Sequence, residues 1–325
     1  MKAIRCEQYG LPNSLIVEDL PSPSPGPGQV LIGVRAAGVN FPDTLIIQNL
    51  YQFKPPLPFT PGGECAGEIK ALGAAVTRFK IGQRVTAFAP WGAFAEEIAV
   101  DEDKVTAIPD ELSFELAASF VMAYGTSYHA LKDRAALRAG ETLLVLGAAG
   151  GVGLAAVEIG KSLGARVIAA ASSDEKLAVC RAHGADECIN YSTENMRERI
   201  KSLTAGRGVD VVYDPVGGDY SEPALRSIGW RGRFLVVGFA NGSIPSIALN
   251  LTLLKGLSIV GVFWGEFTKR EPERWAQDLA DLLRMVNAGE LKPLVSARYP
   301  FDKVADALNA VSARKVIGKI VLTPT

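Results

Sequence analysis

The sequence predicts an α/β protein in which a β-rich module precedes a doubly wound parallel sheet. The first third alternates short β runs with Pro/Gly turns, most densely over 21–28. A glycine-rich turn at 147–153 then joins an apolar run to a helical segment, and strand and helix patterns alternate from there to about residue 262. With 325 residues the chain exceeds what one hydrophobic core usually supports, so we expect two domains.

Composition excludes several function classes. Hydrophobic residues make up 48% of the chain, charged residues 21%, and the net charge is −1, which is typical of a globular protein and gives no reason to expect nucleic acid or an anionic membrane as partner. Arg5 and Glu7 interrupt any signal-peptide core, and the most apolar stretch, 143–157, is too short to span a membrane. We therefore expect a cytoplasmic protein.

Cysteine and histidine usage predicts neither a disulfide framework nor a metal site. The four cysteines, Cys6, Cys65, Cys180 and Cys188, include no C-x-x-C pair, which indicates buried, reduced thiols. The chain has only two histidines, His129 and His183, and neither has partners at ligand spacing, so both are interpreted as structural. The sequence therefore predicts no metal.

The elements follow in two groups. Strands of the β-rich module are expected at 2–7, 15–19, 29–37, 66–72, 84–88 and 94–100, and a helix begins after Ser113 as N-cap. Strands of the second module are expected at 143–146, 166–171, 187–190, 209–213, 233–238 and 257–262, with helices at 152–163 and 174–183. A helix over 273–287 and a final strand over 315–322 complete the prediction.

The turn from Gly147 to Gly153 predicts a dinucleotide site. It follows an apolar strand and precedes a helix, the context in which such glycines let a pyrophosphate approach the backbone. The helix N-terminus supplies N–H groups and positive dipole to the anion. A tight strand-to-helix turn without a ligand is the alternative.

The end of the next strand favours NADPH over NADH. NAD sites usually carry Asp or Glu there for the ribose 2′-hydroxyl, and this chain has Ala171. Ser172 can donate a hydrogen bond to a 2′-phosphate and Lys176 can add charge. Asp174 argues the other way, although it is also well placed as a helix N-cap or first-turn acid.

With these features the sequence resembles the zinc-independent quinone oxidoreductases of the medium-chain dehydrogenase/reductase superfamily. The resemblance rests on motifs spread over the chain: residues 38–43, 61–64, 81–85, 123–126, 148–153, 212–217 and the tail from Arg314 to Gly318. It implies a GroES-like catalytic domain over 1–122 and 263–325 and a Rossmann NADPH-binding domain over 123–262.

The zinc alcohol dehydrogenases of that superfamily differ at the metal positions. They place Cys where this chain has Asn40 and His where it has Gly63, and the region matching their structural-zinc lobe has no cysteine. The resemblance thus implies metal-free hydride transfer from NADPH to a quinone or similar electrophile. Reduction of enone, alkenal or enoyl-CoA double bonds is the alternative within enzymes, and a non-catalytic, crystallin-like or RNA-binding role is the alternative from another class.

The resemblance also implies site residues. Asn40 and Tyr51 are the candidate catalytic groups, with Tyr51 a possible proton donor or a lid aromatic. The implied cofactor contacts are Asn40, Thr126, Ala149, Gly150, Gly151, Val152, Gly153, Ser172, Lys176, Tyr191, Val216, Gly238, Phe239, Phe263, Gly265 and Arg314. A homodimer is expected, pairing through the strand near 257–262.

Overall fold

The computed structural model describes residues 1–324 and divides into two compact units. Unit 1 comprises Met1–Met122 and the chain from Pro293 onward, and unit 2 comprises Ala123–Lys292. Each unit has its own buried apolar core: that of unit 1 includes Ile32 and Phe94, and that of unit 2 includes Leu144 and Ile168. The expected two-domain α/β architecture is thus observed.

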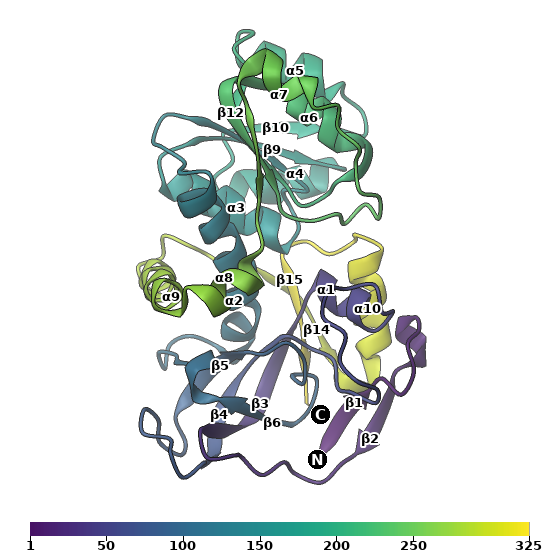
Figure 1. Cartoon of the computed structure of the whole chain (residues 1–325), viewed down its shortest axis with the longest axis vertical. Helices are drawn as coiled ribbons and strands as arrows, with labels where there is room; N and C mark the ends of the chain where they lie inside the picture. Colours follow the sequence, from purple (N-terminus) through teal and green to yellow (C-terminus); the bar gives the residue numbers. More distant parts are fainter. Residues whose placement is uncertain (325) are drawn as a thin grey trace. The chain divides into compact units, whose positions relative to one another are not determined.

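Unit 1 is β-rich, as predicted (Figure 1). Its main sheet has the order β14-β15-β3-β4-β5-β7, with β6 paired to β3, and β1 and β2 form a separate pair. The elements are β1 (Lys2–Arg5), β2 (Ile16–Asp19), β3 (Gln29–Val39), α1 (Phe41–Ile46), β4 (Glu64–Leu72), β5 (Arg84–Phe88), β6 (Glu97–Asp101), β7 (Val105–Ala107), β14 (Val295–Pro300), α10 (Val304–Ser312) and β15 (Lys319–Thr323).

The register of three neighbouring strands builds one end of this sheet. β15 runs antiparallel to β3 with Ile320 opposite Val39, and β3 runs antiparallel to β4 with Gly38 opposite Glu64. The last residues of β3 therefore lie between the first residues of β4 and of β15. Chain segments far apart in the sequence meet here.

Unit 2 contains the predicted doubly wound sheet (Figure 1). All its strands are parallel, in the order β10-β9-β8-β11-β12-β13, so the strand order reverses between β8 and β11. The elements are β8 (Thr142–Leu146), α3 (Gly151–Ser162), β9 (Arg166–Ala171), α4 (Asp174–Ala182), β10 (Glu187–Asn190), α5 (Met196–Leu203), β11 (Val209–Asp214), α6 (Ser221–Arg226), β12 (Ile228–Val236), α7 (Asn250–Lys255) and β13 (Ser258–Gly261).

The chain between 263 and 292 packs with unit 2, which corrects the predicted domain boundary at 263. α2 (Phe114–Tyr128) continues into a π-helical stretch whose His129 ring stacks on Phe267 of α8 (Trp264–Arg270), with 4.0 Å between ring centroids. Lys132 bonds Asp278 of α9 (Pro272–Asn287). These contacts hold α8 and α9 on unit 2, and the chain returns to unit 1 only at Pro293.

Within residues 1–324 no helix combines the length and apolarity needed to cross a lipid bilayer.

Candidate coenzyme and active site

The glycine turn lies where the sequence predicts it, between the end of β8 and the start of α3. A Cβ added at Gly153 would lie 2.2 Å from the carbonyl oxygen of Gly147, so no larger residue fits there without moving the backbone. At Gly150 an added Cβ would meet the same oxygen at 3.4 Å, which is ordinary contact. Gly153 is therefore required by strand–helix packing, whereas Gly150 keeps the turn open.

The N-terminus of α3 presents unused hydrogen-bond donors. Gly150 is the N-cap and has no side chain to satisfy them. The N–H groups of Gly151, Val152 and Gly153 lie in the first turn, where an α-helix offers no internal acceptors. Ala149 is buried immediately before them. This arrangement fits a pyrophosphate, because donors and helix dipole point the same way.

Three predicted residues gather after β9 and β10. The Lys176 ammonium of α4 donates to the Ser172 hydroxyl at 3.2 Å. Tyr191, which follows β10, packs on Tyr220 with ring centroids 4.5 Å apart. The Asp174 carboxylate accepts a hydrogen bond from the Asn190 amide at 2.9 Å, so it stabilises the start of α4 and the end of β10.

Further predicted residues lie after the next strands, at the same carboxyl edge of the sheet. Val216 follows β11, and Gly238 and Phe239 follow β12 and help to line a cavity of about 240 Å³. The buried Asp214 carboxylate accepts the N–H groups of Val216 and Gly217 and the Ser221 hydroxyl. Burial raises the pKa of Asp214. Its hydrogen bonds show that it shapes this loop.

The remaining predicted cofactor residues lie in α2, after β13 and after α10. Thr126 lies half-buried in the second half of α2, and Phe263 and Gly265 follow β13, with the Phe263 side chain 47% exposed. These belong to unit 2. Arg314 belongs to unit 1, after α10, in a left-handed backbone conformation with φ 56°.

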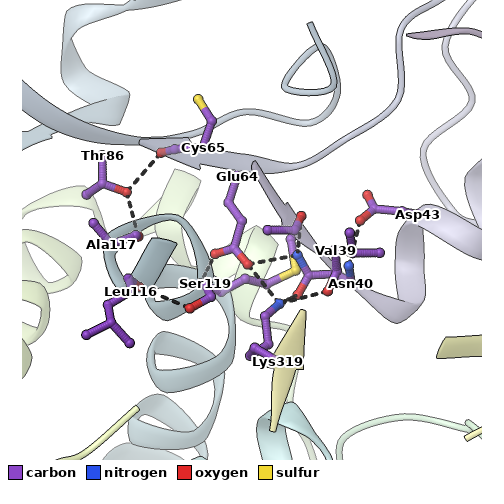
Figure 2. Close-up of polar contacts among 12 residues, drawn as sticks. Val39, Asn40, Asp43, Glu64, Cys65, Thr86, Leu116, Ala117, Ser119 and Lys319 are labelled. Carbon is purple, nitrogen blue, oxygen red and sulfur yellow. Dashed lines mark hydrogen bonds and ion pairs between the residues drawn. The ribbon is translucent and has the colours of Figure 1, made fainter. Parts of the chain in front are cut away.

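Asn40 lies in unit 1 within a buried polar cluster (Figure 2). Its amide nitrogen donates to the Glu64 carboxylate at 2.9 Å and to the Gly38 carbonyl at 3.4 Å, and its amide oxygen accepts from Lys319. Both amide hydrogens thus face protein oxygens. Its main-chain N–H donates to Asp43 at 2.7 Å, at the start of α1.

Asp43 and Tyr51 form an electrostatically coupled pair in the same unit. Burial raises the pKa of Asp43 to about 7, although the N–H of Asn40 and the Lys319 charge oppose the shift. Tyr51 packs edge-on against Phe53, at 5.8 Å between ring centroids. Burial, followed by the Asp43 charge, raises the pKa of Tyr51, so its hydroxyl stays protonated over the physiological range.

Comparison with known proteins decides the family. Residues 26–110 match the alcohol dehydrogenase GroES-like domain and residues 151–284 match the zinc-binding dehydrogenase domain. A quinone oxidoreductase-like protein 2 homolog of Nematostella vectensis is 39% identical over 99% of this chain and 88% of the relative, and a quinone oxidoreductase of Pseudomonas aeruginosa is 38% identical over 99% of each. The crystal structure of Escherichia coli quinone oxidoreductase complexed with NADPH is 29% identical, covers 100% of both chains and superposes with a TM-score of 0.94.

The chain belongs to the quinone oxidoreductase family of the medium-chain dehydrogenase/reductase superfamily. The predicted fold is confirmed, with a GroES-like domain joined to a parallel-sheet nucleotide-binding domain.

The chain does not offer a zinc ion a suitable donor set among its described residues, although one matching domain is described as zinc-binding. Asn40 and Gly63 stand at the metal positions, and burial raises the pKa of the neighbouring Cys65 thiol to about 12, away from the thiolate that a metal needs. The Lys319 ammonium already contacts Glu64, a carboxylate of this cluster, at 2.9 Å. Among residues 1–324 no group of three His, Cys, Asp or Glu side chains is arranged to hold a metal.

The other cysteines and the two histidines of the chain occupy structural positions. All four cysteines are free and buried, as predicted. His129 lies 3.1 Å from Asp133 in the π-helical stretch, and burial lowers its pKa. His183 caps the end of α4 and contacts Glu158 at 2.5 Å.

Two site residues were not singled out by the sequence analysis. The motif at 38–43 contains Asp43 but gives it no role, and the strand pattern at 315–322 contains Lys319 but gives it no role. A single lysine in a β pattern gives no signal of burial, because lysines are usually solvated. The neighbours of Lys319 come from sequence positions 255 to 280 residues away.

Proposed function

We propose that this chain is a zinc-independent, NADPH-dependent oxidoreductase that passes a hydride to a quinone or similar electrophile. The observation that carries the proposal is the carboxyl edge of the parallel sheet in unit 2. There a side-chain-free helix N-terminus lies after the first strand and a lysine–serine pair lies after the second.

The preference for NADPH follows from the charges after β9. The strand ends in Ala171, so no carboxylate stands at the position that repels a 2′-phosphate. Asp174, at the start of α4, is hydrogen-bonded to Asn190, while Lys176 and Ser172 contact each other in a position to share an added phosphate. The NADPH bound to the related Escherichia coli enzyme supports the same assignment.

In this proposal the residues of the chain bind and orient the coenzyme, and one of them protonates the reduced acceptor. NADPH, when bound, supplies two electrons and a hydrogen as hydride from C4 of its nicotinamide. Within unit 2, the turn 149–153 binds the pyrophosphate and Ser172, Lys176 and Tyr191 hold the adenosine and 2′-phosphate. The unit 2 residues assigned to the ribose and nicotinamide are Thr126, Val216, Gly238, Phe239, Phe263 and Gly265. Asn40 and Arg314 are the coenzyme contacts proposed for unit 1. Hydride addition leaves a negative oxygen on the acceptor, which needs a proton.

Tyr51 is the better candidate for the donor to that oxygen. Both amide hydrogens of Asn40 are directed to protein oxygens, so Asn40 contributes by position rather than by donating to substrate. The Tyr51 hydroxyl remains protonated, and the residue is only partly buried. It donates a proton to the reduced acceptor and regains one from water.

A steady-state screen tests the proposal. Purified protein is assayed for NADPH and NADH oxidation with ortho- and para-quinones, 1,4-enones and acyl-CoA thioesters. We expect NADPH oxidation with quinones as the fastest reaction, and zinc content well below one per chain. No measurable NADPH affinity, or stoichiometric tightly bound zinc, contradicts the proposal.

Double-bond reduction is the second candidate, and the protonated Tyr51 favours it, because carbanion-like products require a proton more than quinols do. Faster turnover of enones or thioesters than of quinones in the same screen selects this function. A crystallin-like or RNA-binding role is supported only by the family resemblance, and the net charge of −1 argues against RNA binding. A salt-dependent shift of an RNA probe without NADPH oxidation selects that role instead.

We also propose a cytoplasmic homodimer. β13 is an edge strand of the unit 2 sheet, and exposed apolar side chains lie on it and on α7, which precedes it in the chain: Ile259, Leu253 and Leu254. Such an edge favours pairing with a second copy. Four free thiols are consistent with a reducing compartment. Sedimentation velocity giving only a monomer mass at micromolar concentration contradicts the dimer.

A further inference from the structure

A buried lysine stands at the centre of the polar cluster in unit 1 (Figure 2). The Lys319 ammonium donates to the Val39 carbonyl at 3.0 Å, to the Glu64 carboxylate at 2.9 Å and to the amide oxygen of Asn40. An ammonium has three hydrogens to donate, and these three acceptors use all of them. Lys319 is 7% exposed and Glu64 0% exposed, so water does not share the interaction.

The two charges fix the orientation of the Asn40 amide. The ammonium has only donors and the carboxylate only acceptors, so the amide oxygen must face Lys319 and the amide nitrogen must face Glu64. The flipped amide would set N–H against ammonium and oxygen against carboxylate. Because the cluster is dry, both contacts would be strongly unfavourable.

Glu64 is held from its other side as well. Its second carboxylate oxygen accepts the main-chain N–H of Met122 in α2 at 2.9 Å. The cluster therefore ties together the end of β3, the start of β4, the start of β15 and α2. Asn40 also begins α1, through its main-chain bond to Asp43.

We propose that Lys319 is a positioning residue for hydride transfer: its ammonium, with Glu64, fixes the amide and backbone of Asn40 on the nicotinamide side of the site. The inference rests on the proposed function, which places Asn40 there. Stability alone does not account for the pair, since a buried ion pair is often no more stable than apolar residues of similar volume. The geometry assigns to the pair the orientation of a third residue.

The test removes both charges together, because Lys319→Met alone would leave the Glu64 carboxylate buried without a cation. In the double variant Lys319→Met/Glu64→Gln no charge is stranded, and the Gln side chain retains an acceptor for Met122. Lys255→Met in unit 2 is the control: Lys255 is half-buried and, like Lys319, donates to main-chain carbonyls, here those of Arg226 and Ile228.

NADPH affinity by fluorescence titration and single-turnover oxidation of NADPH by a quinone are measured on wild type and variants. We expect the double variant to keep its NADPH Kd within about twofold, because the adenosine contacts are elsewhere, and to lose about tenfold or more in hydride transfer. The deuterium isotope effect on kcat, with deuterium at the transferred position of C4, is expected to rise because hydride transfer becomes more rate-limiting. Lys255→Met is expected to match wild type.

A cycle with Asn40→Ala shows whether Lys319 acts through Asn40. We expect the triple variant to transfer hydride as slowly as Asn40→Ala alone, since the pair then has no amide to orient. A double variant with wild-type hydride transfer and isotope effect, or losses that multiply in the triple variant, overturns the inference. Failure of the wild type itself to bind or oxidise NADPH instead overturns the proposed function.

Discussion

At the scale of single residues, burial and nearby charge decide what each side chain can do. Asp43, Tyr51 and Asn40 lie within one short stretch of unit 1, yet only Tyr51 is partly exposed, and its hydroxyl stays protonated. Asp43 is buried and its carboxyl titrates near neutrality, and Asn40 has both amide hydrogens directed at protein oxygens. These environments suit Tyr51 to proton donation and Asn40 to positioning.

Replacing Tyr51 with Phe tests the donor role. The change removes one hydroxyl and leaves the ring that packs on Phe53. We expect kcat on enones to fall about tenfold or more, as is usual when a general acid is lost, and kcat on quinones to fall much less because quinols acquire protons readily from water. Equal small losses on both acceptors would assign Tyr51 to packing alone.

The proposed role of Lys176 is to favour NADPH over NADH. Its ammonium, now beside the Ser172 hydroxyl, would gain a phosphate partner. Lys176→Ala should raise KM for NADPH about five- to tenfold, as expected for losing one charge-assisted hydrogen bond, and leave KM for NADH unchanged. The exposed Lys201→Ala in α5 serves as control, and equal rises for both coenzymes would argue against a 2′-phosphate contact.

The raised pKa of Asp43 predicts a pH-dependent stability. In the folded state its pKa is about 7, against an ordinary value of 3.8. The folded chain therefore holds a proton that the unfolded chain has released, so stability is lost progressively as pH rises from about 4 through 7. Asp43→Asn should flatten the fall of Tm between pH 5 and 8 relative to wild type. The exposed Asp103→Asn should not, and an unchanged slope in Asp43→Asn would show that the carboxyl ionises freely.

At the scale of elements, the strand–turn–helix unit β8–α3 was the most predictable part of the chain. Its apolar strand and glycine turn have a local cause, and the structure begins α3 at Gly151, one residue before the predicted start. The strands 84–88, 166–171 and 187–190 also match their predicted bounds. The predicted strand 233–238 begins too late, since β12 begins at Ile228. Polar residues near the start of β12 obscure its apolar pattern in the sequence. α1, β14 and α10 were not predicted, because they are short or lack strong periodicity.

Two glycine substitutions separate packing from ligand binding in this element. Gly153→Ala places a methyl 2.2 Å from the Gly147 carbonyl and should cost about 1–3 kcal/mol of unfolding free energy, with loss of NADPH affinity. Gly150→Ala meets only ordinary contact at 3.4 Å. It should keep stability within about 1 kcal/mol and still weaken NADPH binding, since the methyl occupies the approach of the pyrophosphate. Denaturant unfolding and NADPH titration check both, and undiminished NADPH affinity in Gly150→Ala would contradict the assigned cradle.

At the scale of the whole molecule, the two units differ in how the chain builds them. Unit 2 is one continuous segment, whereas unit 1 needs both ends of the chain. β15 lies between β14 and β3, so the C-terminal segment supplies an interior strand of the unit 1 sheet and the only cation in contact with Glu64 among the described residues.

Deleting residues 293–325 should therefore affect the units unequally. Unit 1 loses β14, β15 and Lys319, which exposes the edge of β3 and leaves Glu64 unpaired in its core. We expect the truncated chain to lose the thermal transition of unit 1 and all turnover. Unit 2 should still fold and should bind NADPH more weakly, because its sheet and cofactor turn are intact whereas Arg314 is lost. Calorimetry with NADPH titration checks this, and loss of NADPH binding together with unit 1 would show that the units do not fold independently.

The sequence by itself determined what depends on local pattern: the β-rich first third, the parallel sheet, the glycine turn and the absence of a carboxylate at Ala171. These are set by periodicities of two and 3.6 residues and by the conformational freedom of glycine, which neighbours along the chain express directly. Only the tertiary structure decided that α8 and α9 belong to unit 2, that Asp43 is buried enough to titrate near neutrality, and that Lys319 orients Asn40. The first property follows from contacts of α8 and α9 with the π-helical stretch after α2. The other two arise where β3, β4 and β15 meet, and a contact between residues 40 and 319 leaves no periodic trace in either segment.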